Sequence, residues 1–348
     1  MADAMPRLTS LAHGGGCGCK LSPSVLQTML GGLPMAGNFP DLLVGTETSD
    51  DAAVWRLNDE QALVATTDFF TPIVDDPYDF GRIAAANALS DVYAMGGKPI
   101  MALALVGMPL GKLPVEVMRR IIEGGASICA QVGVPVAGGH SIDNAEPIYG
   151  LVALGLVHPK RLRRNCDAQA GDVLVLGKRL GVGVYSSALK KEMLPEGCYA
   201  EMLASCTQVN TVGAELSALP GVHAITDVTG FGLLGHAGEI ARGSKLRLTI
   251  RSANLRFLPQ VLELAEAGCI TGASGRNWSS YGEAVNIAEH LPPLTRDLLC
   301  DPQTNGGLLV SCAPDALDEV LATMRNAGFA HAHVVGAAAA GEPGISVV

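Results

Sequence analysis

Residues 62–106 read ALVATTDFFTPIVDDPYDFGRIAAANALSDVYAMGGKPIMALALV, and this stretch decides the fold. Two apolar runs, at 62–67 and 100–106, have the length and composition of buried strands. Between them, residues 80–95 have the pattern of a helix, which two glycines and a proline then end. A strand, a helix and a second strand in this order predict an α/β layer structure.

The rest of the chain continues this alternation. We expect helices to cover one face of a mixed sheet in each of two domains. A basic, polar stretch at 160–171 marks a boundary, which gives a flexible glycine-rich segment and linker at 1–40, a first domain at 41–160 and a second at 170–348. The further strands expected are 53–57, 134–137, 148–157 and 222–226, and the further helices are 23–30, 114–132, 199–219 and 232–241.

The composition limits the classes of function. With 348 residues, of which 48% are hydrophobic and 17% charged, the chain is long enough for two compact domains. Its net charge of −10 argues against direct binding of nucleic acid, which needs a basic surface. No apolar run reaches the roughly 18 residues of a membrane span, and no secretory signal is visible. Nine cysteines without such a signal indicate reduced thiols, so we expect a cytoplasmic protein.

A glycine-rich segment, HGGGCGCK at 13–20, carries two thiols and an amine. Its four glycines predict a mobile loop rather than a helix or a strand. Because a neighbouring cation raises the thiolate fraction of a cysteine, Lys20 would make Cys17 and Cys19 more reactive. Two other interpretations stay open, a disordered tail and half of a metal site. A phosphate-binding loop of the Walker type is excluded, because Lys20 has the wrong neighbours.

Five aspartates stand near the ends of predicted elements. Two precede a strand, one ends a strand, one follows a strand, and one lies on the helix at 80–95 beside Asn87. Each could be an ordinary turn or cap residue. As a set near strand ends they indicate a ligand site, and Mg²⁺ prefers such oxygen ligands. The five are Asp50, Asp51, Asp68, Asp227 and Asp91.

Six motifs follow one another through most of the chain. They are HGGGCGCK at 13–20, SDDAAV at 49–54, TTDFFTPIVDDPYDFGRIAAANALSDVYAMGGKP at 66–99, AGGHSID at 137–143, TDVTGFGLLGH at 226–236 and DPQTNGGLL at 301–309. Together they closely resemble the selenophosphate synthetase family, also called selenide, water dikinase, within the superfamily of aminoimidazole ribonucleotide synthetase-like enzymes that use ATP. The cysteine and lysine loop narrows the match to this family. Asn305 stands where most members have serine, and asparagine tolerates the same turn geometry.

The resemblance implies a two-domain fold of that superfamily, in which first-domain sheets from two subunits form a barrel-like dimer interface. It also implies a reaction in which ATP, selenide and water give selenophosphate, AMP and phosphate. Cys17 and Lys20 would be catalytic, and Asp51, Asp91 and Asp227 would hold Mg²⁺. The residues implied to contact ATP are Lys20, Thr48, Ser49, Asp50, Asp68 and Asp91 and, from the partner subunit of a homodimer with shared sites, Gly139, His140 and Ser141.

Two alternative functions stay open at this point. Another ATP-using enzyme of the superfamily, such as a small-molecule kinase or a cyclase, would share the aspartates but has no use for Cys17 and Lys20. A selenium-binding carrier without enzymatic activity would use the thiols but would not need five aspartates.

Overall fold

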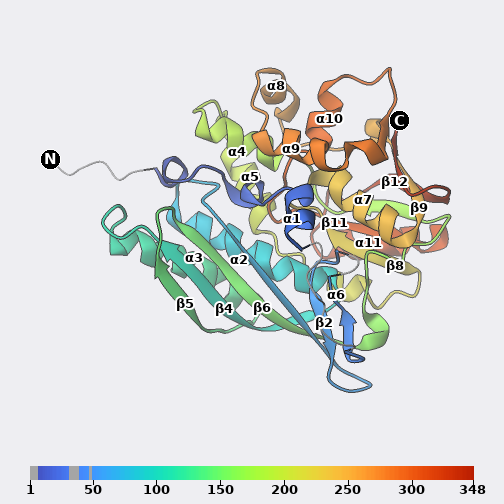
Figure 1. Ribbon diagram of the computed structural model, residues 1–348, viewed down its shortest axis with the longest axis horizontal. Coiled ribbons are helices and arrows are strands. Elements are labelled where there is room, and N and C mark those ends of the chain that lie inside the picture. The colour runs from blue at the N-terminus through green and yellow to red at the C-terminus, as the bar shows by residue number, and fades with distance from the viewer. Residues whose placement is uncertain (1–6, 31–38, 47–48) are drawn as a thin grey trace.

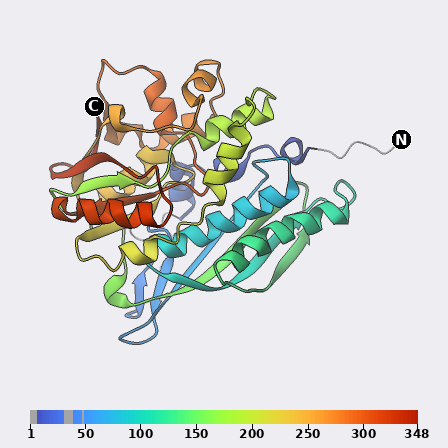
Figure 2. The same ribbon diagram turned by 180° about the vertical axis from the view of Figure 1, so that it is seen from behind.

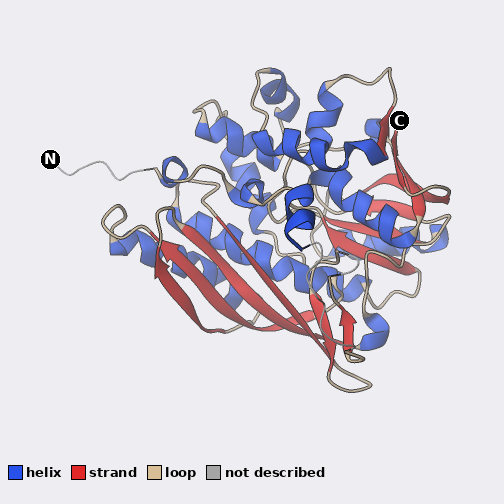
Figure 3. Ribbon diagram, in the orientation of Figure 1, coloured by secondary structure: helices blue, strands red, loops and turns tan. Residues whose placement is uncertain are grey.

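The computed structural model describes residues 7–30, 39–46 and 49–348, which form two mixed sheets with helices packed on them (Figures 1 and 3). The prediction of an α/β structure with mixed, helix-covered sheets is confirmed. Within these ranges, no helix is long and apolar enough to cross a bilayer. All nine cysteines are free thiols, as the sequence predicted.

The first sheet has six strands in the order β1-β2-β3-β6-β4-β5, and it is open rather than closed into a barrel. All of its strand pairs are antiparallel except β4 with β5. Seen from behind, α2 and α3 lie across one face of this sheet (Figure 2). The elements are β1 (Leu42–Val44), β2 (Ala53–Arg56), β3 (Ala62–Phe70), α2 (Pro77–Ala94), β4 (Lys98–Met108), α3 (Val115–Gln131), β5 (Val136–Asp143) and β6 (Ile148–Val157).

The second sheet has seven strands in the order β10-β13-β9-β12-β7-β11-β8. Its strands are β7 (Val173–Leu176), β8 (Val222–Asp227), β9 (Leu246–Ile250), β10 (Val285–Ile287), β11 (Leu308–Cys312), β12 (His333–Ala340) and β13 (Gly344–Val347). The remaining helices are α1 (Pro23–Leu30), α4 (Val182–Lys190), α5 (Cys198–Thr207), α6 (Gly213–Leu216), α7 (Gly232–Ser244), α8 (Val261–Glu266), α9 (Gly272–Tyr281), α10 (Leu294–Leu299) and α11 (Leu317–Asn326).

Helix α2 lies between the two halves of the molecule. Asp76 caps its first turn by accepting a hydrogen bond from the Asp79 N–H, and thirteen of its 18 residues are buried, so both sides are covered. On one side it packs against the first sheet and α3, and on the other against α5 and β8. Gly81 permits this closeness, because a Cβ there would lie 1.8 Å from the Ile121 carbonyl oxygen of α3. Side chains of α2 therefore reach the boundary between the two sheets.

Three local predictions are wrong. The strand expected at 134–137 begins later and is longer, because it is β5 at Val136–Asp143. The helix expected at 199–219 is two helices, α5 and α6, because tertiary contacts break it at 208–212. There the buried Asn210 side chain donates to Ser90 Oγ (2.8 Å), while the Gln208 carbonyl accepts from the buried Lys178 ammonium (2.7 Å). Asp68 does not end its strand, since β3 continues to Phe70.

Candidate functional site

Three aspartates from three different elements meet at one point. Asp51 precedes β2, Asp91 lies on α2, and Asp227 ends β8. One carboxylate oxygen of each lies within 4.8 Å of the other two, a geometry that no other trio of His, Cys, Asp or Glu shows within residues 7–30, 39–46 and 49–348. The structure thus brings together the three residues for which the sequence predicted a metal role.

Hydroxyl groups link the three aspartates in a row, from Asp91 through Asp227 to Asp51. Each of the three aspartates accepts a hydrogen bond from a serine or threonine on another element. Each of these donors also lies directly before, or two residues before, an aspartate of its own element. Sequence reasoning missed these donors, although Ser or Thr directly before Asp recurs in the SDD, TTD, SD and TD motifs. The three bonds are Thr226 Oγ1 to Asp51 (2.8 Å), Ser90 Oγ to Asp227 (2.5 Å) and Thr66 Oγ1 to Asp91 (2.5 Å).

The electrostatics of the cluster favour a bound cation. Burial and then repulsion from neighbouring carboxylates raise the pKa of Asp51 and of Asp91 well above the ordinary value, and burial raises the pKa of Asp227. Asp51 Oδ2 is buried without a hydrogen-bond partner. A donor set of carboxylate oxygens alone fits a hard ion such as Mg²⁺, which would relieve both the repulsion and the unpaired oxygen.

The cysteine segment is packed between the two halves of the molecule rather than exposed. The sequence predicted a mobile loop without helical structure here, but residues Gly16–Cys19 form one turn of 3₁₀ helix, and Cys17 is only 1% exposed. The Gly16 N–H donates to the Thr71 carbonyl (2.9 Å), and the Cys17 N–H donates to Thr304 Oγ1 (3.1 Å). These bonds give the glycine-rich backbone partners on both halves of the molecule.

Asn87 connects the thiol to the carboxylates. Its Oδ1 accepts from Cys17 Sγ (3.2 Å) and from the Asn305 N–H (2.7 Å), and its Nδ2 donates to Asp68 Oδ2 (2.5 Å). The backbone donor of Asn305 fixes which way the amide points. Lys20 Nζ donates to the same Asp68 oxygen (3.1 Å). The sequence placed Asn87 on the face of Asp91 but assigned it no role.

Burial opposes one expectation about reactivity. It raises the pKa of the Cys17 thiol well above its ordinary value, and the opposing effect of Lys20 is smaller. Burial also disfavours the charge on Lys20, but Asp68 and then Cys17 outweigh it and raise the pKa of the amine. Lys20 thus favours the thiolate in the direction that the sequence predicted, but burial outweighs its effect in this conformation.

The other predicted ATP contacts lie in two places. Ser49 and Asp50 are held by Asn165, whose side chain donates to the Ser49 carbonyl (2.9 Å) and whose N–H donates to Asp50 Oδ1 (2.7 Å). Thr48 lies outside the described residues.

Asn305 was expected to tolerate the geometry of a turn, and it does adopt a left-handed conformation, with φ of 47°.

Gly139, His140 and Ser141 lie on β5, the exposed edge strand of the first sheet. Four strand spacings, roughly 19 Å, separate β5 from β2, which follows Asp51. The structure therefore does not bring these three residues to the aspartates of their own chain. A Cβ on Gly139 would lie 2.0 Å from the Ala104 carbonyl oxygen, so packing against β4 already requires glycine there, with or without a phosphate.

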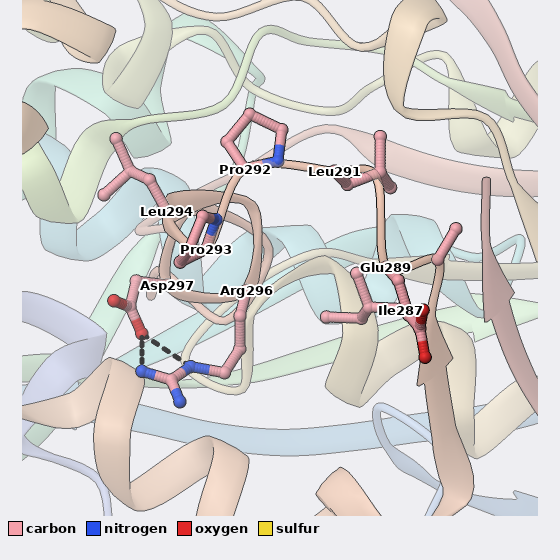
Figure 4. A pocket seen from close by; sticks show the side chains of 9 residues that line it. Ile287, Glu289, Leu291, Pro292, Pro293, Leu294, Arg296 and Asp297 are labelled. Carbon is pink, nitrogen blue, oxygen red and sulfur yellow. Dashed lines mark hydrogen bonds and ion pairs between the residues drawn. The ribbon is translucent and has the colours of Figure 1, made fainter.

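A cavity of about 510 Å³ lies elsewhere, beside α10 in the C-terminal half (Figure 4). Apolar residues such as Leu291 and Pro292 line it, and two of its three charged residues, Arg296 and Asp297, pair with each other. None of the predicted site residues lines this cavity.

Models of known protein families match both halves of the chain. The model for the N-terminal domain of AIR synthase related proteins matches residues 49–157, and the model for the C-terminal domain matches residues 169–348. A selenide, water dikinase from Paraburkholderia xenovorans is 63% identical over 343 residues, which cover 99% of this chain and 97% of the relative. One from Rhizobium meliloti is 60% identical over the full 348 residues of both chains. The chain belongs to the selenide, water dikinase family.

Membership of the selenide, water dikinase family confirms the resemblance inferred from the six motifs. The fold itself is shared more widely. Thiamine-monophosphate kinase from Stenotrophomonas maltophilia superposes with a TM-score of 0.63 at 21% identity, covering 88% of this chain and 91% of the kinase. At that identity the likeness concerns the fold alone.

The packing of the cysteine segment predicts the effect of Gly230→Ala. A Cβ there would lie 2.8 Å from the Cys17 carbonyl oxygen, so the segment must move outward. Overpacking of this kind costs about 1–3 kcal/mol, which should raise the rate of Cys17 alkylation by iodoacetamide about fivefold or more. Mass spectrometry of the peptide that contains Cys17 measures this rate.

Gly238→Ala is the matched control, because only Ile345 Cδ1, at 3.9 Å, would contact its Cβ. It should leave the alkylation rate of Cys17 unchanged. Equal rates in Gly230→Ala and the wild type would show that Cys17 is not packed in solution as the structure has it.

Proposed function

We propose that this protein synthesises selenophosphate from ATP, selenide and water, and releases AMP and phosphate. The observation that supports it most strongly is the meeting of Cys17, Asn87, Asp68 and Lys20 within one hydrogen-bonded chain beside the aspartate cluster. In the reaction, the γ-phosphoryl group of ATP is transferred to selenium, and the remaining ADP is hydrolysed to AMP and phosphate. The assignment agrees with the names of the relatives that are 60–63% identical to this chain.

The residues divide the work of phosphoryl transfer, which needs mainly positioning and neutralisation of charge. Asp51, Asp91 and Asp227 would hold Mg²⁺, which would supply positive charge to offset the negative charge of the phosphates. The charged amine of Lys20 attracts the anionic phosphates. Asp68 holds that amine in place until the nucleotide arrives.

The Cys17 thiol offers a soft atom, the kind of group that interacts with selenium better than a hydroxyl does. Its S–H donates to Asn87 in the packed state, so the thiol must leave that contact before it can act as a thiolate. We assign Cys17 and Lys20 as the catalytic pair on this ground. Ser49 and Asp50, together with Thr48, are assigned to the nucleotide.

The domain division that we propose follows the two sheets, with a first domain at 41–160 and a second at 170–348 after the catalytic segment and linker at 1–40. The first sheet ends at Val157 and the second begins at Val173, which is compatible with this division. The nine free thiols agree with a location in the reducing cytoplasm.

We further propose a homodimer formed through the uncovered face of the first sheet. Most side chains on that face are apolar, and cross-strand neighbours there include Leu63 with Leu156 and Leu103 with Val152. Phe69 on the same face is 49% exposed. An apolar face of this extent on a sheet indicates an interface, and a second copy of the sheet would cover it and form a barrel-like layer.

Such a dimer would let each active site use residues of both subunits. Because β5 lies roughly 19 Å from β2, Gly139, His140 and Ser141 are too far away to serve the aspartates of their own chain. We propose that they contact the nucleotide bound by the partner subunit.

Product analysis tests the proposed reaction. Purified protein should release AMP from ATP only when selenide is present. Cys17→Ser should lower this activity by at least about 100-fold, because one positioned catalytic group commonly contributes that much to a reaction rate. Cys19→Ser serves as the control and should have a milder effect. ADP as the sole product would indicate a small-molecule kinase, and selenium binding without nucleotide turnover would indicate a carrier.

Mixed dimers test the shared site. Cys17→Ala and His140→Ala should each be nearly inactive alone, but one site of a mixed dimer would collect both defects and the other none. Random mixing would leave about a quarter of all sites intact, so activity should partly return. If mixed dimers form and stay inactive, His140 serves its own chain and the shared site is wrong.

A further inference from the structure

The segment that links the two sheets passes close to the residues that precede Asp51. Asn165, in this link, is fully buried and makes two hydrogen bonds to them. Its side-chain Nδ2 donates to the Ser49 carbonyl oxygen (2.9 Å), and its main-chain N–H donates to Asp50 Oδ1 (2.7 Å). One residue of the link thus binds two consecutive residues that are 115 and 116 positions away in the chain.

The residues that Asn165 binds adopt an unfavourable conformation. Ser49 has φ of 56°, in the left-handed region, which costs a residue with a Cβ about 1–2 kcal/mol. Asp51 follows two positions later, so the turn at Ser49 sets the direction in which the Asp51 carboxylate points. Surrounding contacts must hold such a turn, and Asn165 supplies two of them.

Asn165 is itself anchored to the other side of the site. Its carbonyl oxygen accepts from Ser244 Oγ (3.2 Å), and that hydroxyl in turn accepts from the Ala168 N–H (3.1 Å). Ser244 is the last residue of α7, the helix that begins five residues after Asp227. The link therefore connects the turn before Asp51 to the helix after Asp227.

We propose that Asn165 is a positioning residue for the metal and nucleotide site, which holds the Ser49 turn so that Asp51 meets Asp91 and Asp227. The proposal rests on the metal role proposed above for these three aspartates. Among the described residues, Asn165 makes no hydrogen bond to the carboxylates of Asp51, Asp91 or Asp227, so it acts through residues 49 and 50.

Binding of Mn²⁺ alone, a spectroscopic substitute for Mg²⁺, tests the proposal without turnover. Electron paramagnetic resonance measures free Mn²⁺ and so gives the dissociation constant. This constant should be about tenfold larger for Asn165→Ala than for the wild type, because removing a group that orients a metal ligand usually weakens metal binding to this extent. Asn165→Asp keeps the size of the side chain but turns an acceptor toward the Ser49 carbonyl, and should weaken binding at least as much. Circular dichroism shows whether both variants fold.

Ser49→Gly separates positioning from a general structural role. Glycine adopts the left-handed turn without the cost of a Cβ, so Asn165→Ala should weaken Mn²⁺ binding less in a Ser49→Gly background than in the wild type. Asp167→Asn, which removes a charge that pairs with Arg164 (2.7 Å) in the same link, is the matched control and should leave binding unchanged.

The outcomes distinguish this proposal from the proposed function. If the wild type binds no Mn²⁺, the metal role of the aspartates fails. If the wild type binds and Asn165→Ala and Asn165→Asp bind within twofold of it, the role of Asn165 fails while the metal role stands. Unfolding of both variants would show that Asn165 serves the stability of the fold. An equal loss of Mn²⁺ binding in both Ser49 backgrounds would show that Asn165 does not act through the Ser49 turn, and either result would overturn the proposal.

Discussion

The repulsion among Asp51, Asp91 and Asp227 is the constraint on which the rest of the site depends. Two unit charges at 4 Å repel by about 4 kcal/mol at an effective dielectric of 20, and here three groups lie within 4.8 Å of one another. The fold holds the three aspartates together through hydroxyl donors that connect the elements. Each donor lies near one aspartate in sequence and donates a hydrogen bond to an aspartate of a different element. A site held in this way is ready for a cation and is unfavourable without one.

Helix α2 gives this arrangement its rigidity. Because it is covered by the first sheet and α3 on one side and by α5 and β8 on the other, its side chains have little freedom. Asn87, Ser90 and Asp91 lie within one stretch of five residues of the helix, and they reach the Cys17 thiol, Asp227 and the aspartate cluster. One buried helix thus aligns the cysteine segment of the N-terminal region with a carboxylate of the second sheet. The sharing of the site between distant segments explains why it lies at the boundary of the two sheets.

Local patterns predicted the elements better than the contacts between them. The helix at 23–30 and the strand at 148–157 have the predicted bounds, because apolar runs bounded by proline, glycine or polar residues define them locally. The expected helix at 199–219 failed because two residues in its middle have distant partners, Asn210 with Ser90 and Gln208 with Lys178, which are 120 and 30 residues away. The burial of Cys17 was missed for the same reason, since its partners Asn87 and Thr304 are 70 and 287 residues away. The grouping of the three aspartates came from the family resemblance, and periodicity could not have provided it.

Calorimetric titration with Mg²⁺ in the presence of a non-hydrolysable ATP analogue tests the central claim most directly. The account predicts that Asp51→Asn, Asp91→Asn and Asp227→Asn each weaken Mg²⁺ binding by about tenfold or more, because each removes a charge from the donor set without changing its shape. Asp315→Asn, on the surface near α11, provides the control for loss of one negative charge. Unchanged Mg²⁺ affinity in all three site variants would contradict the account and return these aspartates to ordinary turn and helix residues.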